Sequence, residues 1–231
     1  NVVNPDLLVK EYGADTVRAY LMFLGPWDAG AAWNSQGIEG LARFFKTVWT
    51  LCNLEGKNSS NVSNEIDEKL LKSLHQTIKK VTNELQNFRF NTAIASLMAF
   101  RNVLKAEGEA AGSEIWNECL EGMLLMLAPI APHITEELWQ KLKPGSGSIH
   151  MQTWPACDEN LAAEDLIILV VQVNGKVRDR LEIRTGTSKV ETEKTIQIPE
   201  GSRVVTIIID KGEVTEKVYL SPDGDRIIVK Y

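Results

Sequence analysis

A proline-framed segment past the middle of the chain, Met123 to Trp139 (MLLMLAPIAPHITEELW), most strongly limits how the chain can fold. Pro129 and Pro132 lack a backbone N–H and disfavour helical backbone in the preceding residue, so a helix that reaches them must end. Pro132 also suits the first turn of a following helix, where the missing N–H costs nothing. Apolar residues on both sides of this proline corner, such as Leu127, belong in one core. The segment predicts two helices joined by a tight corner.

Before the corner, the chain repeats an amphipathic helical pattern. Apolar residues in 65–87 step by threes and fours and leave the lysines outside, which is typical of a helix with one buried stripe. We also expect helices over 14–24, over 36–54 with Ser35 as N-cap, over 88–106 with Asn91 as N-cap, and from Ser113 to the corner. A shorter helix opens at Asn4–Pro5 and ends at Gly13. Helices of this kind joined by short loops predict an antiparallel bundle.

After Lys143 the pattern changes. Residues 149–155 suggest a short extended piece, and an acidic, loop-like stretch follows. Asn174-Gly175 then lies between two alternating segments, 165–173 and 176–183, which is a strong signal for a β-hairpin. Its two-residue loop predicts three cross-strand pairs, which are Val173–Lys176, Val171–Arg178 and Leu169–Arg180. Further strand-like runs are 195–199, 203–210, 214–220 and 226–231.

These patterns predict an α+β multidomain protein, in which an antiparallel α-helical bundle is followed by a small β-rich α+β C-terminal domain. The bundle is expected over 35–148, a linker over 149–164 and the small domain over 165–231. Residues 1–34 form a separate leading segment.

Composition excludes several classes of protein. The longest apolar run, around the corner, is too short and too broken by proline to cross a membrane. The three cysteines, at 52, 119 and 157, form no CxxC pair, so we expect reduced thiols in a cytoplasmic protein and neither a disulfide framework nor a metal site. The first residues, NVVNPDLL, contain neither an initiator Met nor a signal pattern. We therefore expect a piece of a longer protein.

The net charge of −6 is unevenly distributed. Residues 165–231 hold 11 basic and 11 acidic side chains, so 1–164 hold 25 − 11 = 14 basic and 31 − 11 = 20 acidic ones. An acidic bundle is a poor nonspecific binder of nucleic acid, because attraction to phosphate supplies that affinity. Any contact with nucleic acid must come from local basic patches.

No catalytic constellation is present in the sequence, and its glycines match neither a P-loop nor a dinucleotide-binding motif. Of the three histidines, only His133 draws attention, because it lies just inside the helix after Pro132. Its side chain either caps or packs the corner, or contacts a ligand. Glu136 and Glu137 are either paired carboxylates or, more simply, a negative first turn that complements the helix dipole.

Two basic faces are candidate binding sites. Alternation along the predicted hairpin puts Lys176, Arg178 and Arg180 on one face, where they could follow a phosphate backbone. The alternative is a solvated face that prevents an exposed strand from pairing with other chains. Arg43 and Lys46 share a helix side with the same two interpretations.

Several of these stretches resemble one family. LLMLAPIAPHITEELW resembles the helical-bundle signature of class I aminoacyl-tRNA synthetases of the Leu/Ile/Val/Met group, and FNTAIASLM also fits their bundle. NPDLLVKEYGADTVRAYLMFLGPWD resembles the segment after their KMSKS loop. SIHMQTWP followed by VVQVNGKVRDRLEI is similar to the bacterial-type leucine enzymes of that group. The resemblance covers about residues 1–184.

The resemblance implies a tRNA-binding portion that contains no active site, in which 1–34 is the end of the catalytic-core and stem-contact segment. The bundle would be the anticodon-binding domain, and Pro129, Pro132, His133 and Trp139 would form its structural corner. The parent would be a monomeric cytoplasmic ligase that attaches leucine to tRNA with ATP and Mg²⁺, and this part would need no cofactor. Its partners would be leucine tRNA and the catalytic and editing domains, with Lys176, Arg178, Arg180, Arg43 and Lys46 as candidate tRNA contacts.

Three further observations concern the tail, the other members of this group and a noncatalytic alternative. Family tails place helix after the hairpin, whereas 185–202 here suggest strand and turn, so the tail is expected to have a variant topology. An isoleucine-type tail would offer a cysteine zinc site and a valine-type tail a long coiled coil, and neither pattern is present. A noncatalytic adaptor that reuses a synthetase bundle for protein contacts is the alternative from another class.

Overall fold

A computed structural model describes residues 3–26, 28–29, 32–34, 37–54, 63–108 and 111–163, and the backbone of five strands between residues 166 and 230. The chain divides into two compact units, Asn1–Ala163 and Glu164–Tyr231. Ser35 and the run 195–199 lie outside the described residues, as do Asn174-Gly175 and 185–202.

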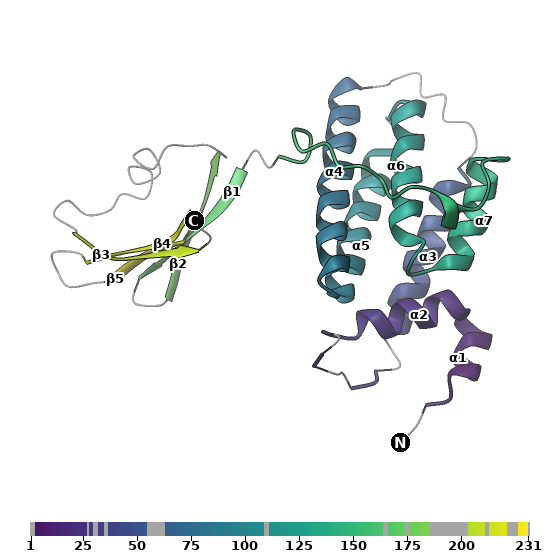
Figure 1. The fold of residues 1–231 in the computed structure, drawn as a ribbon, viewed down its shortest axis with the longest axis horizontal. Helices are drawn as coiled ribbons and strands as arrows, with labels where there is room; N and C mark the ends of the chain where they lie inside the picture. Colours follow the sequence, from purple (N-terminus) through teal and green to yellow (C-terminus); the bar gives the residue numbers. More distant parts are fainter. Residues whose placement is uncertain are drawn as a thin grey trace. The chain divides into compact units, whose positions relative to one another are not determined.

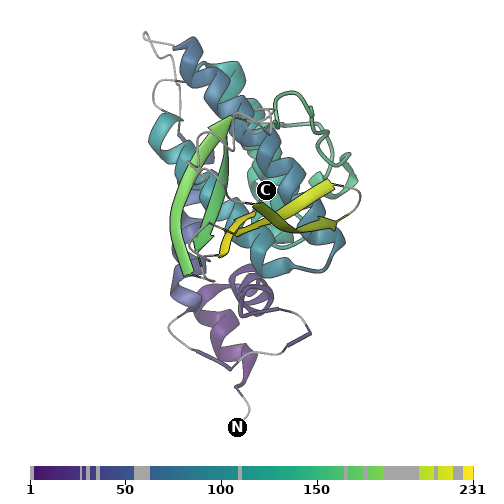
Figure 2. The same ribbon diagram turned by 90° about the vertical axis from the view of Figure 1, so that its left-hand side faces the viewer.

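The first unit is built from helices (Figures 1 and 2). They are α1 (Pro5–Tyr12), α2 (Ala14–Phe23), α3 (Ile38–Cys52), α4 (Asn64–Gln86), α5 (Phe90–Glu107), α6 (Ser113–Leu127) and α7 (Pro132–Leu142), with a 3-10 turn η2 (Ile149–Met151). Helices α3 to α7 stand side by side, and α1 and α2 lie across their lower end (Figure 1). The predicted helical bundle is confirmed. No helix in the described part of the chain is long and apolar enough to span a membrane.

The core of this unit forms where the apolar stripes of the helices meet. On α4, the predicted stripe is buried at Leu70, Leu74, Ile78 and Val81. Gly122 lets α6 approach this stripe closely, because a Cβ there would lie 2.6 Å from Leu74 Cδ1. Burial of these surfaces, at about 25 cal/mol per Å², supplies most of the stability of such a bundle.

Helix α5 begins two residues earlier than an N-cap at Asn91 implies, so the assignment of Asn91 as its N-cap is wrong. Phe88 has φ of 55°, which ends α4 and turns the chain, and Phe90 is the first residue of α5. Thr92 Oγ1 donates to the Arg89 carbonyl (2.9 Å) and to the Glu84 carboxylate. Residues other than glycine rarely adopt the left-handed region, so the sequence pattern does not indicate this turn.

The stretch after α7 differs from the predicted extended piece over 149–155 in its first three residues. Residues 149–151 form η2, and the side chain of Ser148 caps it by accepting from the His150 N–H. The following residues, up to Ala163, belong to the first unit.

Among its described residues, the second unit has five antiparallel strands in the order β2-β1-β5-β4-β3. Their bounds are β1 Leu166–Val173, β2 Lys176–Arg184, β3 Arg203–Asp210, β4 Glu213–Leu220 and β5 Arg226–Lys230. Of these five strands, β2 therefore lies at one edge.

Candidate functional site

The proline corner joins α6 to α7 within one turn. The Ala131 N–H donates to the Leu127 carbonyl (2.9 Å), Pro129 lies in the turn between the helices, and Pro132 is the first residue of α7. Trp139 is buried on α7, and its indole N–H has no hydrogen-bond partner within the described part of the chain. The corner therefore sets the direction of α7, and the Trp139 ring of this helix is part of the core.

The first turn of α7 is held by a carboxylate from α2, which lies far from α7 in the sequence. Asp15, in the first turn of α2, accepts hydrogen bonds from the backbone N–H groups of His133 (3.0 Å) and Ile134 (2.7 Å). His133 Nδ1 lies 2.8 Å from the other carboxylate oxygen of Asp15. The Asp15 side chain is 11% exposed, whereas that of His133 is 75% exposed. A buried negative charge thus caps the helix and fixes the orientation of an exposed imidazole.

Asp15 was missed at the sequence level. It shows there only as an acidic residue in the first turn of its own helix, with no sign of a partner 118 residues away. The prediction that Glu136 and Glu137 supply the negative first turn is wrong, because α7 has no acidic residue in its first turn. They are not a carboxylate pair either, since Glu136 binds Ser148 and Glu137 lies 3.4 Å from Lys141.

An open hollow of about 510 Å³ lies beside the Asp15 anchor. It is lined by the α1–α2 junction, by one face of α3 and by the start of α7, namely Tyr12, Gly13, Ala14, Asp15, Thr16, Ala42, Phe45, Lys46, Trp49, His133 and Ile134. The hollow brings together Lys46 and His133, which the sequence suggested separately. Trp49 is 38% exposed, and Lys141 Nζ lies 4.0 Å from the centre of its ring, a cation–π contact.

A second hollow, of about 540 Å³, adjoins the first through His133. Its other lining residues are Pro132, Glu136, Glu137, Gln140, Lys141 and His150. Hydrogen bonds from Ser148 and Gln140 hold the pKa of Glu136 below its ordinary value. The Glu136 carboxylate therefore has a structural role at the edge of this hollow.

Arg43, the other predicted residue of α3, is not in the lining of either hollow. Its side chain is 77% exposed and its guanidinium lies 3.9 Å from the Glu39 carboxylate, a surface pair that contributes little to stability. Exposed cations beside an accessible indole can contact phosphates and stack on a base. Among the described residues, no group of three His, Cys, Asp or Glu side chains could hold a metal ion.

The hairpin carries the remaining predicted site residues, and its register differs from the expectation. Lys176 pairs with Val173 as predicted, but a shift between Val171 and Gln172 follows. Beyond the shift, Val171 pairs with Asp179 and Val170 with Arg180, so the expected pairs of Arg178 and Arg180 are wrong. A β-bulge adds one residue to a strand and interrupts its alternation. The register therefore does not put the three basic positions on a single face.

Three comparisons with known proteins bear on this arrangement. Residues 67–195 match the family described as the anticodon-binding domain of tRNA ligase. The chain is 45% identical over 232 residues to a leucine–tRNA ligase of Dehalococcoides mccartyi strain CBDB1, which covers 100% of this chain and 28% of that protein. It is 49% identical over 197 residues to the leucine–tRNA ligase of strain 195 of the same species, covering 84% of this chain and 24% of that protein.

A solved structure is similar to the chain as well. It is the crystal structure of the LeuRS of Agrobacterium radiobacter K84 in a ternary complex with tRNA and LeuAMS, with a TM-score of 0.70 and 29% sequence identity. The similarity covers 92% of this chain and 29% of that one. The chain thus spans less than a third of the length of each of these relatives.

Proposed function

We propose that this chain, which belongs to the family of anticodon-binding domains of tRNA ligases, is the tRNA-binding portion of a leucine–tRNA ligase. The observation that carries the proposal is the 45% identity to a leucine–tRNA ligase along the whole chain, through both the bundle and the strand-containing unit. In this proposal, the second unit is a small α+β C-terminal domain, and the chain binds and positions tRNA while the active site lies elsewhere in the parent enzyme.

The hollow beside Asp15 supports a specific mode of binding on the bundle. Because residues 1–164 carry six more acidic than basic groups, long-range attraction to phosphate cannot provide the affinity. Contact would depend on local groups, with Lys46 and the nearby Arg43 on phosphates and Trp49 against a base or ribose. On the second unit, Lys176, Arg178 and Arg180 would contribute further phosphate contacts from the edge strand.

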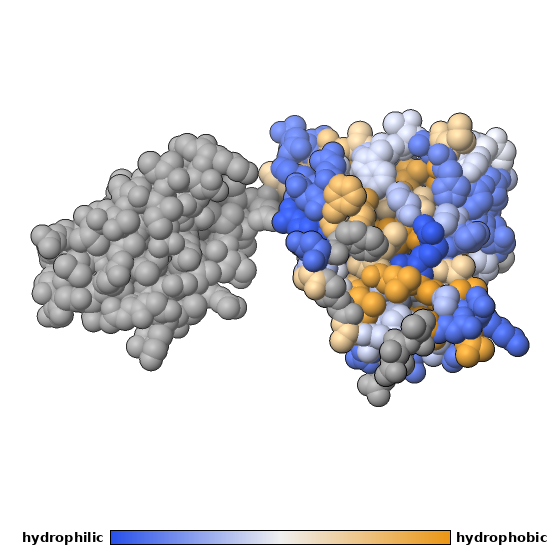
Figure 3. Space-filling model, turned by 60° about the horizontal axis from the view of Figure 1, so that its bottom comes forward, coloured by the Kyte–Doolittle hydropathy of each residue, from blue (hydrophilic) through white to orange (hydrophobic). Residues whose placement is uncertain are grey.

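The parent would attach leucine to tRNA with ATP and Mg²⁺ in its other domains, in the cytoplasm and as a monomer. The end of the first unit that carries α1 and α2 supports contact with those domains. Leu7 is 70% exposed and Leu21 50% exposed, and hydrophobic residues gather on this side of the unit when it is turned toward the viewer (Figure 3). Exposed apolar surface of this kind is typical of a contact with another domain.

Binding of the chain to leucine tRNA and to an unrelated tRNA, at about 50 and about 200 mM salt, tests the proposal. We expect preference for leucine tRNA that persists at the higher salt concentration. The double variant Arg43→Ala/Lys46→Ala and the triple variant Lys176→Ala/Arg178→Ala/Arg180→Ala should each weaken binding.

The matched control is Lys80→Ala/Lys105→Ala, which removes the same charge from exposed positions on α4 and α5. If the chain binds no tRNA, the proposal is wrong and the protein-interaction adaptor becomes the better interpretation. If the control weakens binding as much as the α3 variant does, the α3 assignment is wrong.

A further inference from the structure

The segment that follows α7, residues 148–163, is named the strap. It begins fixed to α7, because the Glu136 carboxylate accepts from Ser148 Oγ (2.7 Å) and from the Ile149 N–H (3.0 Å), and Ile149 is 2% exposed. From there the strap runs along the outside of the helices to α4 (Figures 1 and 2). The sequence suggested a linker here, whereas the structure holds these residues against the bundle.

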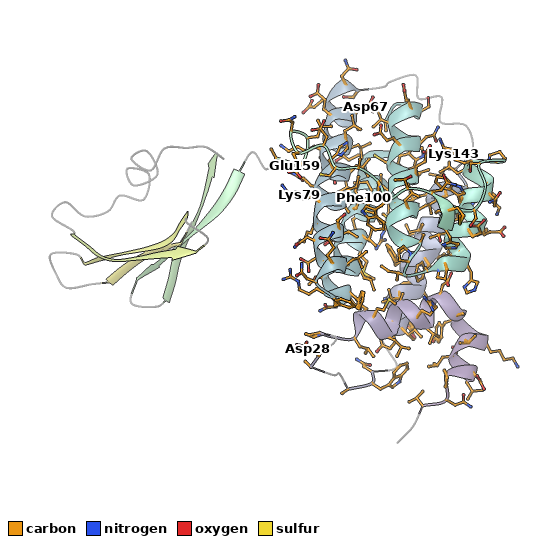
Figure 4. All side chains as sticks on the ribbon, in the orientation of Figure 1. Asp28, Asp67, Lys79, Phe100, Lys143 and Glu159 are labelled. Atoms are coloured by element: carbon orange, nitrogen blue, oxygen red, sulfur yellow. The ribbon has the colours of Figure 1, made fainter. Side chains whose placement is uncertain are left out.

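Three side chains of α4 hold the far part of the strap. The contacts are Trp154 Nε1 to Thr82 Oγ1 (2.8 Å), the Asp158 N–H to His75 Nδ1 (3.1 Å), and Lys79 Nζ to Glu159 Oε2 (2.6 Å; Figure 4). Positions 75, 79 and 82 are spaced i, i+4 and i+7, so they lie on one face of the helix. The strap therefore follows a single stripe of α4 and does not touch it at isolated points.

The strap ends in a turn that is itself capped. Asp158 Oδ1 accepts from the Asn160 N–H (2.8 Å), and the Asp158 carbonyl accepts from the Ala162 N–H (2.9 Å). Ala162 is 5% exposed, and the first unit extends one residue beyond it, to Ala163. Only residues 163–165 separate Ala162 from Leu166, the first residue of β1.

We propose that the strap is a clasp that fixes the point from which the second unit is tethered, so that both units bind one tRNA molecule together. The proposal rests on the tRNA-binding function proposed above and adds His75, Lys79 and Thr82 as positioning residues for it. A tether of a few residues keeps the second unit at high effective concentration once the first has bound.

Release of the strap would lengthen this tether from about 4 to about 17 residue steps. Effective concentration falls roughly as the −3/2 power of tether length, so the affinity for tRNA should fall by about tenfold. The groups that contact tRNA would be unchanged. The loss would therefore appear only in molecules in which both units can bind.

The test compares two variants of the full chain. In the first, His75→Leu, Lys79→Ala and Thr82→Val remove the three α4 contacts and leave the strap sequence unchanged. In the second, about 13 Gly/Ser residues are inserted after Ala163, which lengthens the tether with the clasp intact. The control is Lys80→Ala, which removes an exposed charge from a position on α4 outside the stripe. For each variant we would measure the affinity for leucine tRNA, the radius of gyration of the free chain by small-angle scattering, and the helical signal by circular dichroism.

We expect both variants to retain the helical signal, to increase the radius of gyration and to bind leucine tRNA about tenfold more weakly, with the control unchanged. Wild-type affinity in the insertion variant would overturn the proposal, because tether length would then not matter. An unchanged radius of gyration after removal of the three contacts would also overturn it. That second result is independent of tRNA, so it separates failure of the clasp from failure of the proposed function.

Discussion

Replacement of Asp15 by alanine should destabilise the bundle far more than loss of an ordinary surface charge would. The carboxylate is 11% exposed, caps two backbone N–H groups of α7 and pairs with the ring of His133. Loss of an N-cap costs about 1–2 kcal/mol. A buried hydrogen bond to a charged group contributes about 1.5–3 kcal/mol. Because these contributions overlap, we expect Asp15→Ala to lower the free energy of unfolding by about 2–4 kcal/mol.

Urea unfolding of the full chain, followed by circular dichroism at 222 nm, measures this change, because the helical signal reports the first unit. Asp15→Asn keeps one acceptor oxygen but loses the charge, so it should cost less, about 1–2 kcal/mol. Amide hydrogen exchange at His133 and Ile134 should accelerate in Asp15→Ala before the rest of α7 is affected.

The control is Asp28→Ala, which removes an exposed carboxylate and should change stability by at most about 0.5 kcal/mol. A loss below about 1 kcal/mol in Asp15→Ala would refute the reasoning, because the capped amides would then have other partners. Equal losses for Ala and Asn would show that the charge contributes nothing.

Three further changes test the packing of the first unit. Leu127→Ala should cost about 2–5 kcal/mol in urea unfolding, since this side chain is 1% exposed at the proline corner, and a loss below about 1 kcal/mol would contradict its place in the core. Gly122→Ala should cost about 1–3 kcal/mol because its Cβ would meet Leu74 Cδ1 at 2.6 Å. Gly40→Ala, with nothing within 4 Å, should stabilise the helix by about 0.5 kcal/mol, and effects of the same sign in the two glycine variants would refute this account. Burial raises the pKa of the Cys119 thiol to about 12, so this thiol should resist alkylation by iodoacetamide in the folded protein at about pH 8. The free energy of unfolding should fall above about pH 9, because there the unfolded chain releases the thiol proton and the folded chain does not. Mass spectrometry of the alkylated protein and unfolding with and without Cys119→Ala check this, and alkylation of the folded chain at the unfolded rate would contradict it.

The parts of the fold that depend on local pattern could be predicted from the sequence. The helix expected over 65–87 is α4, Asn64–Gln86, because a repeated three-and-four spacing defines both its type and its length. The proline corner could be predicted equally well, because Pro129 and Pro132 interrupt a continuous helix whatever surrounds them. Both conclusions needed only residues that are near one another in the chain.

The other features depend on contacts between residues that are far apart in the sequence. Asp15 and His133 are 118 residues apart, and Trp154 and Thr82 are 72 apart, so neither pair leaves a periodic signal. The one-residue shift in β2 is a third case, because alternation along a strand is assumed until the partner strand is known. The tRNA role of the basic residues, including Lys46, stays a prediction.

The Asp15 anchor also has a consequence for the order in which the first unit can fold. Its partners, His133 and Ile134, are made long after α2, so the lower end of the bundle cannot close while the chain is shorter than about these positions. Synthesis at roughly 5–20 residues per second delays that closure by several seconds after α2 appears. Contacts of large sequence separation also slow folding, because the chain between them must be ordered first. During synthesis, α1 and α2 therefore cannot pack against α7 until the proline corner has been made. Until then, the nascent protein exposes their apolar side chains.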